Sequence, residues 1–222
     1  MSQDPRNDGT SMEAYYRERA TVYDEFYRVG RRKDDLVALK SWVLERVRGG
    51  TILEVAAGTG YWTEVAAPVA KAITATDYNP ETLAIAAQRR LGPHVTLTVA
   101  DAYRLPDIPR VFDVGIAMLW WSHIHKQRRR EFLSHFTSRL APGALILMFD
   151  QFYIEGLSNP ISRSDEWDNL YTVRTLPNGA NYEIVKNYPT DQELIDTFSE
   201  FCEDVVVTRL GEFWTLSARV RR

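Results

Sequence analysis

Apolar residues recur at two spacings along this chain, and the two spacings alternate. Helical spacing appears within 16–27 and again within 36–47, where the second helix ends at Gly49-Gly50. Short apolar runs typical of strands follow, with helical segments between them. We predict strands near 51–56, 72–76, 95–100, 112–118 and 144–150, and helices near 61–69, 80–90 and 126–139. This alternation indicates a parallel sheet with helices on both faces.

The first ten residues and the segment after residue 150 do not follow this alternation. The polar, turn-rich residues Met1 to Thr10 are expected to be disordered. An irregular stretch is expected from Asp150 to about Asn169. After it we predict a hairpin of 171–174 and 182–185 around Pro177-Asn178-Gly179, a helix over 191–201, and strands over 205–210 and 212–220.

One apolar run ends in a glycine turn and is the most informative feature of the sequence. Residues 52–57 are typical of a strand buried on both faces, and Gly58 and Gly60 let the backbone turn sharply beside a ligand. The amides of the following helix would then face an anionic group. The third glycine of the dinucleotide-binding pattern is replaced by Thr63, and no Walker lysine follows. The loop therefore favours another kind of nucleotide-like cofactor.

Acidic residues stand at the ends of the next two apolar runs. Asp77 follows 72–76 and is able to accept hydrogen bonds from both hydroxyls of an unmodified ribose. Asp101 follows 95–100, where its carboxylate would accept from an exocyclic amine while the Ala102 N–H reaches a ring nitrogen. Together these positions predict recognition of an adenine nucleoside.

The chain resembles the class I S-adenosylmethionine-dependent methyltransferases through four motifs in the family's order: LEVAAGTGYWT, TATDYNPETLAIA, VADAYRLP and RVFDVGIAMLWWSHI. The similarity covers roughly residues 12–150. It implies S-adenosyl-L-methionine as cofactor and an α/β, Rossmann-like doubly wound sheet of seven strands. The sheet would be mostly parallel with an antiparallel last strand, with helices on both faces and an amino-terminal helical lid. We expect one domain over 11–222, made of a helical cap (11–50), a cofactor-binding core (51–150), a substrate-side insertion with a hairpin (151–190) and a closing helix and strands (191–222).

The resemblance also implies which residues contact the cofactor. The methionine moiety would be surrounded by Glu54, Ala56, Gly58 and Gly60. Asp77 would bind the ribose, Tyr78 would cover the adenine, and Asp101 with Ala102 would meet its edge. Other residues expected around the cofactor are Tyr16, Tyr23, Ala57, Thr59, Trp62, Tyr103, Met118 and Leu119. Ala57 stands where many members have Cys or Gly, a difference that leaves a backbone contact intact.

The loops at the carboxyl ends of the strands are expected to build the acceptor site, because ligands of doubly wound sheets bind there. Past the fourth strand, Trp120 and Trp121 are candidates to wall a flat or cationic acceptor, although we expect at least one of them in the core. His123 is a candidate general base, since its usual pKa suits proton removal at neutral pH. A helix-capping role is the alternative for this histidine.

Two further segments are expected to close the acceptor pocket. Asp150, Tyr153 and Arg163 would border it, and Arg163 is a candidate partner for a substrate carboxylate. Aromatic and basic residues of the amino-terminal helices would form a lid that meets the cofactor carboxylate, unless they simply pack together: Tyr15, Tyr16, Tyr23 and Arg19.

Three other features carry no function in this interpretation. His123-Ile124-His125 offers two metal ligands without a supporting Asp, Glu or Cys, so no metal site is predicted. The basic run 126–130 begins a helix whose apolar positions face the core, which favours a solvated face over a nucleic-acid patch. Cys202, the only cysteine, cannot form an intrachain disulfide and is expected to pack near a helix end.

Composition limits the remaining choices. The 222 residues are 45% hydrophobic with a formal net charge of −3, which favours a soluble protein with neither nucleic acid nor membrane as partner. We find no signal-peptide pattern and no run of apolar residues long enough to span a membrane, so the cytoplasm is the expected location.

The sequence thus predicts a methyltransferase that moves a methyl group to an O or N atom of a small molecule by in-line displacement, as a monomer or homodimer. The segment after the fourth strand lacks the Asn/Asp-Pro-Pro-aromatic signature of many enzymes that methylate amino groups of nucleic acids and proteins. An RNA or protein methyltransferase, a non-catalytic S-adenosylmethionine-binding protein and a nicotinamide-dependent oxidoreductase remain as alternatives.

Overall fold

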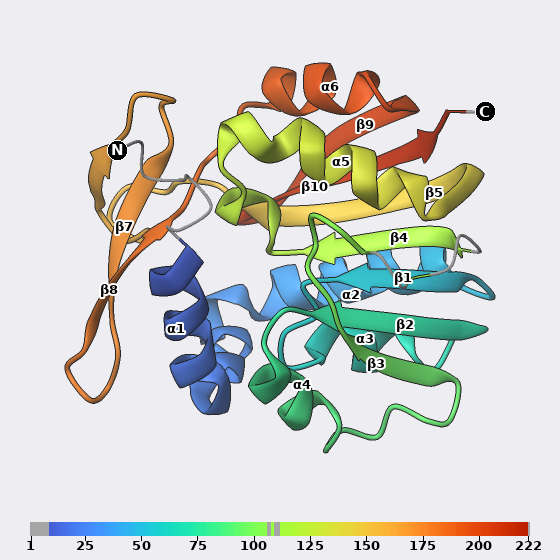
Figure 1. The fold of residues 1–222 in the computed structure, drawn as a ribbon, viewed down its shortest axis with the longest axis horizontal. Helices are drawn as coiled ribbons and strands as arrows, with labels where there is room; N and C mark the ends of the chain where they lie inside the picture. Colours follow the sequence, from blue (N-terminus) through green and yellow to red (C-terminus); the bar gives the residue numbers. More distant parts are fainter. Residues whose placement is uncertain (1–8, 106–107, 109–111, 222) are drawn as a thin grey trace.

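A computed structural model describes residues 9–105, 108 and 112–221, and two sheets organise it (Figure 1). The strands of the larger sheet are β1 (Thr51–Val55), β2 (Ala72–Asp77), β3 (Val95–Val99), β4 (Phe112–Met118), β5 (Leu140–Gln151), β9 (Cys202–Leu210) and β10 (Phe213–Val220). Their order is β3-β2-β1-β4-β5-β10-β9. β10 is antiparallel to both of its neighbours, whereas β1 to β5 pair in parallel. The seven-stranded sheet with an antiparallel last strand is therefore confirmed.

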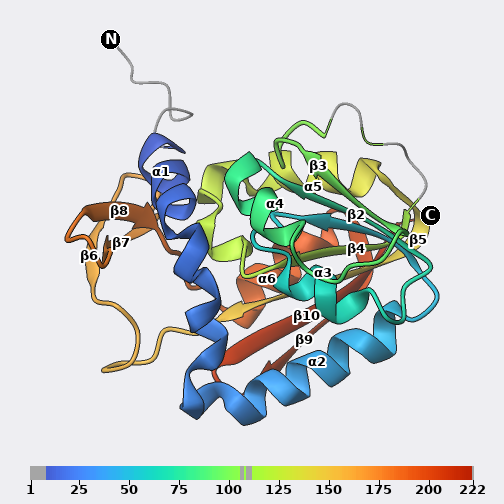
Figure 2. The same cartoon turned by 90° about the horizontal axis from the view of Figure 1, so that it is seen from below.

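Helices cover both faces of this sheet, as the alternating pattern predicts (Figure 2). The helices, with η marking 3-10 geometry, are α1 (Gly9–Arg19), η2 (Ala20–Arg28), η3 (Gly30–Arg32), α2 (Lys33–Val47), α3 (Tyr61–Ala66), α4 (Pro80–Ala86), η4 (Trp121–His123), η5 (Lys126–Arg128), α5 (Arg129–Ser138) and α6 (Asp191–Ser199). One buried cluster joins α2 and α3 to the sheet, and a second joins α5 and α6 to it. Within the described part of the chain, no helix has the length and apolar character needed to cross a membrane.

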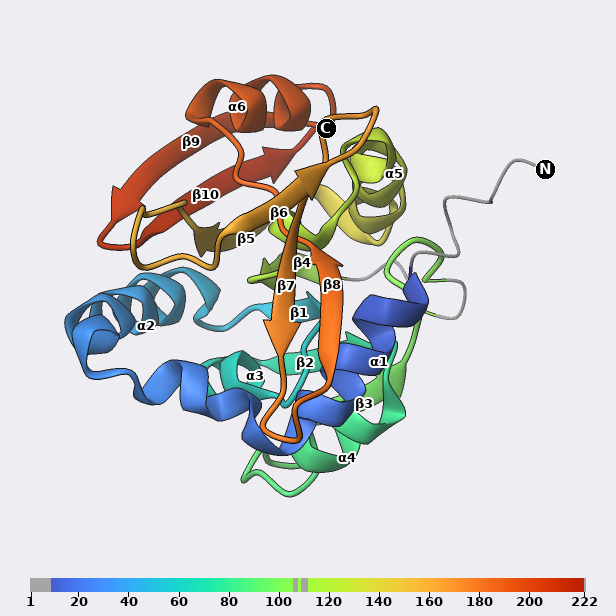
Figure 3. The ribbon, with the colours of Figure 1, turned by 90° about the vertical axis from the view of Figure 1, so that its left-hand side faces the viewer.

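The smaller sheet stands beside the carboxyl ends of the parallel strands and packs against α1 (Figure 3). Its strands are β6 (Ile161–Ser164), β7 (Leu170–Thr175) and β8 (Asn181–Val185), in that order and antiparallel. The hairpin of β7 and β8 was predicted. β6 lies in a stretch predicted to be irregular, because its four residues are all exposed and show no alternation of apolar and polar positions.

The amino-terminal region differs from its sequence prediction in two respects. The helical spacing within 16–27 belongs to two elements, since α1 ends at Arg19 and the chain continues in 3-10 geometry through η2. α1 begins at Gly9, inside the segment predicted to be disordered, and residues 1–8 of that segment lie outside the described residues.

Candidate active site

The loop after β1 departs from ordinary backbone geometry at three positions. Ala56, Gly58 and Gly60 have φ angles of 56°, 57° and 73°, in the left-handed region that favours glycine. A side chain at Gly60 would place its Cβ 2.8 Å from the Cβ of Ala86 in α4. The second glycine is thus required by helix packing, while Ala56 and Gly58 face a cavity.

Thr63 stands where the dinucleotide-binding pattern has its third glycine, and its side chain forms a buried hydrogen bond. Its hydroxyl donates a 2.6 Å hydrogen bond to Oε2 of Glu54, and both side chains are buried. Burial raises the pKa of Glu54 to about 7 and the nearby Asp77 carboxylate adds to the rise, whereas the hydrogen bond from the Thr63 hydroxyl acts in the opposite direction. Glu54 is therefore a buried acid that titrates near neutral pH.

This buried acid makes stability depend on pH. The pKa of Glu54 is about 7 in the folded chain against 4.5 for the unperturbed group, so the folded state holds the proton more tightly. Its contribution to stability is present in full below about pH 4.5 and is lost as the pH rises through 7, a change of about 3 kcal/mol. Glu54→Gln should remove this loss. Urea unfolding at pH 5 and pH 8 measures it, and parallel pH profiles for both proteins would contradict it.

Arg89 connects the glycine loop to the amino-terminal helices through hydrogen bonds and ion pairs. Its guanidinium donates to the Thr59 carbonyl at 2.5 Å and pairs with Glu64 of α3 at 2.5 Å and with Asp24 of η2. The Thr59 hydroxyl also donates to Asp24 at 2.7 Å. One cation therefore ties α3, η2 and the loop together, and it fixes η2 beside the carboxyl end of β1.

Asp77, at the end of β2, holds the same loop from the other side. Its carboxylate accepts from the Gly58 amide at 2.8 Å, from the Asn79 amide at 2.9 Å and from the Thr82 hydroxyl at 3.1 Å. Burial raises the pKa of Asp77, and these hydrogen bonds act in the opposite direction. The Tyr78 backbone amide is a fourth donor to this carboxylate, so a ligand hydroxyl would share or replace one of these bonds.

The end of β3 provides an aromatic wall. Asp101 accepts from the Tyr103 amide at 2.9 Å. The Tyr103 ring lies under the Arg128 guanidinium, 3.5 Å from its centre, and meets Trp120 edge to face. The buried indole N–H of Trp120 has no hydrogen-bond partner among the described residues. A flat group placed here would find both a stacking surface and a free donor.

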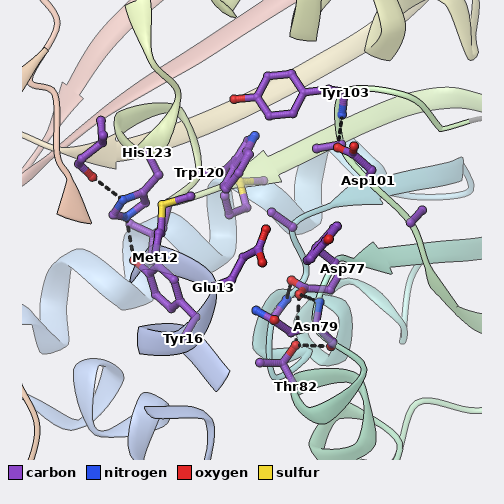
Figure 4. Close-up of a pocket in the computed structure, with 18 of the residues that line it drawn as sticks. Met12, Glu13, Tyr16, Asp77, Asn79, Thr82, Asp101, Tyr103, Trp120 and His123 are labelled. Atoms are coloured by element: carbon purple, nitrogen blue, oxygen red, sulfur yellow. Dashed lines mark hydrogen bonds between the residues drawn. The ribbon is translucent and has the colours of Figure 1, made fainter. Parts of the chain in front are cut away.

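These side chains border a first cavity of about 570 Å³ between the sheet, α1 and the small sheet (Figure 4). The sequence-predicted residues that line it are Tyr16, Tyr23, Ala56, Gly58, Thr59, Asp77, Tyr78, Asp101, Ala102, Tyr103, Met118, Leu119, Trp120 and His123. Residues that sequence reasoning missed are Met12, Glu13, Ala20, Asn79, Thr82, Ala100, Arg104, His125, Arg128, Glu131, Tyr171, Glu183 and Val185. Most of these come from α1, the small sheet or the helix after β4, which meet the strand ends only through tertiary packing.

Four residues predicted around the cofactor lie outside the lining of this cavity: Glu54, Ala57, Gly60 and Trp62. Trp62 is the clearest departure, since it is 3% exposed and packs edge to face on Phe149 at 4.8 Å. It faces the core because it lies in α3 on the side that contacts the sheet. Trp121 is also in the core, against Phe198 of α6, which leaves Trp120 as the only one of the pair at the cavity.

His123 lies at the junction of α1, η4 and β8, and its ring is held from two sides. Nδ1 is 2.7 Å from the Val185 carbonyl, which accepts only, so Nδ1 carries the proton. Nε2 then accepts from the Tyr16 hydroxyl at 2.7 Å. Burial and the positive charge of Lys186 lower the pKa of His123 well below its usual 6.5. The ring is therefore neutral, with a lone pair on Nε2.

The three residues predicted to border the acceptor pocket occupy other places. Asp150 is fully buried and pairs with Lys186 at 2.9 Å. Burial acts to raise the pKa of Asp150, but the Lys186 ammonium brings it below its usual value. Tyr153 is exposed and packs on Tyr188, and Arg163 pairs with Glu183 at 2.8 Å on the surface of β6. Arg163 misses both cavities because the insertion folds into a sheet whose outer strand carries this residue, and Asp150 lies in the buried end of β5.

A second cavity of about 350 Å³ adjoins the first. It is lined by Tyr16, Arg19, Tyr23, Glu25, Phe26, Val29, Arg31, Arg32, Leu119, His123, Gln151, Leu157, Ser158, Asn159, Arg174, Lys186 and Tyr188. The two cavities share Tyr16, Tyr23, Leu119 and His123. Leu119 has a φ of 58°, so the backbone after β4 turns sharply where the cavities meet.

Comparison with known proteins bears directly on this arrangement. The methyltransferase-domain family matches residues 52–143, from β1 into the start of β5. A search of curated protein sequences finds no match. Among solved structures, a DhpI–SAH complex is 27% identical over 96% of this chain and 96% of its own length, with a TM-score of 0.76. A DhpI–SAM–HEP complex is 26% identical over 95% and 96%, with a TM-score of 0.78.

The matched segment contains the glycine loop, both strand-end acids and the turn after β4. Residues 52–143 thus match a methyltransferase domain, and the chain has the class I fold of S-adenosylmethionine-dependent methyltransferases. The methyltransferase also shares its fold with the PH0226 protein from Pyrococcus horikoshii, at 15% identity over 90% of this chain and 100% of the other, with a TM-score of 0.70. A group of three or more metal-ligating side chains does not occur among the residues that the structure describes.

Proposed function

We propose that this enzyme transfers a methyl group from S-adenosylmethionine to an O or N atom of a small molecule. The observation that carries the proposal is the meeting of two cavities at Tyr16, Tyr23, Leu119 and His123. One cavity contains the family's cofactor motifs, and the other is a separate polar space with a candidate base at the junction.

The first cavity fits the cofactor in its chemistry as well as its size. Asp77 offers an acceptor for ribose hydroxyls, and Asp101 with Ala102 offers the acceptor and the amide for an adenine edge. The unpaired indole N–H of Trp120 is a further donor at that end. We assign the methionine end to the loop at Ala56 and Gly58, beneath α1 and η2. When bound, the cofactor supplies an activated methyl group on its sulfonium sulfur.

The second cavity supports a small acceptor. Its volume of about 350 Å³ lies at the lower end of the range for small-molecule sites. α1 covers it from one side and packs on the small sheet, so an extended polymer would have to displace this helix. The Glu18 carboxylate also accepts from the Tyr182 hydroxyl at 2.6 Å, which joins α1 to β8 at the surface.

The protein's own contribution to the reaction would be orientation and proton removal. α1 and the loops at the strand ends would hold the nucleophilic atom of the acceptor at the junction of the two cavities, where proximity and orientation favour methyl transfer. Nε2 of His123 would take the proton of an acceptor hydroxyl or ammonium, which frees the lone pair of that oxygen or nitrogen for the attack. This step requires the Tyr16 hydroxyl to give up its hydrogen bond to Nε2 and yield the place to the acceptor. Val185 keeps the ring in the required tautomer through Nδ1.

Cofactor binding and turnover test this function separately. Calorimetric titration with S-adenosylmethionine, S-adenosylhomocysteine and NAD should give micromolar binding of the two sulfur compounds only. Release of S-adenosylhomocysteine is then followed with panels of small alcohols, phenols and amines, and with total RNA and a protein extract. Turnover on a small molecule supports the proposal; turnover confined to RNA or protein, or binding without any turnover, contradicts it.

A further inference from the structure

We propose that the acceptor carries a negatively charged oxyanion group, such as a carboxylate, sulfonate or phosphate, and that Arg174 and Arg19 bind this group in the second cavity. The inference rests on the proposed function and gives the acceptor its chemical class. It starts from the charges that line the cavity.

The lining of the second cavity is strongly cationic. It includes Arg19, Arg31, Arg32, Arg174 and Lys186, and its one carboxylate is Glu25. The chain as a whole has a formal net charge of −3, so this concentration of positive charge is a local feature. A cavity walled by guanidinium groups favours an anion, because water is partly excluded and each charge acts at short range.

Three of the five cations already have partners. Arg31 and Arg32 share the Glu212 carboxylate, at 2.7 and 2.8 Å. Lys186 donates to Asp150 at 2.9 Å and to the Ser122 hydroxyl at 2.7 Å. These groups shape the positive potential of the cavity, but much of their charge is neutralised by the protein.

Arg174 and Arg19 remain without a counter-charge among the described residues. The Nε of Arg174, in β7, is buried and has no hydrogen-bond partner. The Arg19 guanidinium donates to the Tyr15 hydroxyl at 2.7 Å and lies over the rings of Tyr15 and Tyr23, contacts that leave its charge uncompensated. A buried donor without a partner costs about 1–3 kcal/mol, so a ligand that satisfies it gains affinity. Guanidinium groups match the oxygen geometry of carboxylates and phosphates.

The positions of these arginines assign them to the acceptor. Both line the second cavity, and neither lines the first, which holds the cofactor motifs. Arg174 comes from the small sheet and Arg19 from α1, so they approach the second cavity from different elements. The competing role is recognition of the cofactor's own carboxylate, and it makes a different prediction for cofactor affinity.

The same charges act on the candidate base. Burial, then the Lys186 ammonium and also Arg174 lower the pKa of His123, while Asp150 acts in the opposite direction. An anionic acceptor placed among these cations offsets their effect and makes Nε2 more basic. The charge of the acceptor therefore strengthens the base that removes its proton.

Binding of inorganic oxyanions tests the proposal without knowledge of the acceptor. The full-length enzyme, saturated with S-adenosylhomocysteine, is titrated with inorganic phosphate, sulfate and acetate at constant ionic strength, by calorimetry. We expect saturable binding of at least one anion, weakened about 10-fold or more in Arg174→Met and in Arg19→Met. Arg174→Lys should retain part of the affinity. Arg130→Met removes an equal charge from α5, outside both cavities, and should change nothing.

Three results would overturn the assignment. The first is the absence of saturable anion binding in the wild-type enzyme. The second is equal anion affinity in the wild type and in both methionine variants. The third is a 10-fold loss of S-adenosylhomocysteine affinity in Arg174→Met with anion binding intact, since that would place this arginine at the cofactor carboxylate. The relative affinities of phosphate, sulfate and acetate indicate which oxyanion the acceptor carries.

Turnover assays separate this inference from the proposed function. Matched acceptors with and without the anion are compared: glycolate with ethylene glycol, and 2-aminoethyl phosphate with ethanolamine. Turnover on the charged member, with a KM raised about 10-fold or more in Arg174→Met, supports both proposals. Turnover on neutral acceptors alone overturns the anionic acceptor and leaves the small-molecule methyltransferase standing. Failure to bind S-adenosylhomocysteine would count against the proposed function itself.

Discussion

Asp77→Ala is expected to weaken S-adenosylhomocysteine binding by about 30-fold. The carboxylate holds the Gly58 and Asn79 amides of the structure, and in the proposed complex it would also accept from the ribose. A hydrogen bond to a charged group contributes about 2 kcal/mol, which corresponds to that loss. Calorimetry on the purified variant measures the effect, with a circular dichroism spectrum and a thermal melt to establish that it is folded.

A second acidic substitution provides the comparison. Asp101→Ala removes an acceptor at the adenine end without touching the glycine loop, so its effect on S-adenosylhomocysteine affinity should be smaller. The two acids also differ in burial, since Asp77 is largely shielded from water and Asp101 is more accessible. Unchanged affinity in a folded Asp77→Ala variant would show that the ribose lies elsewhere in the first cavity.

His123→Ala should lower kcat by about 100-fold while S-adenosylhomocysteine affinity stays within a few-fold of the wild type. The reason is the loss of the Nε2 lone pair that takes the acceptor's proton. Because burial and Lys186 hold the pKa of His123 well below 6.5, the imidazole stays neutral through the physiological range. Protonation of this group should therefore reduce the activity only when the pH falls well below 6.5.

Tyr16→Phe is the matched control for that experiment. It removes the hydroxyl that donates to Nε2 but keeps the aromatic ring of α1 in place. If His123 acts as a base, Tyr16→Phe should retain most of the kcat that His123→Ala loses. Equal losses of kcat in the two variants would mean that the Tyr16–His123 hydrogen bond serves to position α1. His123 would then not be the base in the reaction.

The sequence predicted much of the lining of the first cavity because these residues stand in short contiguous segments at strand ends. Gly58, Asp77 and Asp101 each follow an apolar run, and parallel strands bring such positions to one edge of a sheet. The seven-stranded sheet with its antiparallel β10 followed from the same resemblance. Local pattern was sufficient here, since neighbouring residues in the chain remain neighbours in the cavity.

The lining of the second cavity was harder to predict, because the packing of separate elements decides it. Arg174 and Lys186 reach the second cavity through the way β7 and β8 lean on α1. Arg163, the arginine chosen from sequence, lies one strand further out, on β6. Because β6 was not predicted, the sequence did not indicate that Arg174, and not Arg163, lines the second cavity. Trp62 and Trp121 illustrate the same limit, since a motif position does not tell which face of a helix meets the core.

α1 has a further consequence through Tyr16, the residue it contributes to both cavities. A ligand that contacts Tyr16 in either cavity would restrain the same helix, so the second ligand would meet a surface that is already ordered. The two affinities are then linked, and each ligand must strengthen the other by the same factor. Methyl donor and acceptor would thus bind cooperatively, and dissociation of either one would lower the affinity of the enzyme for the other.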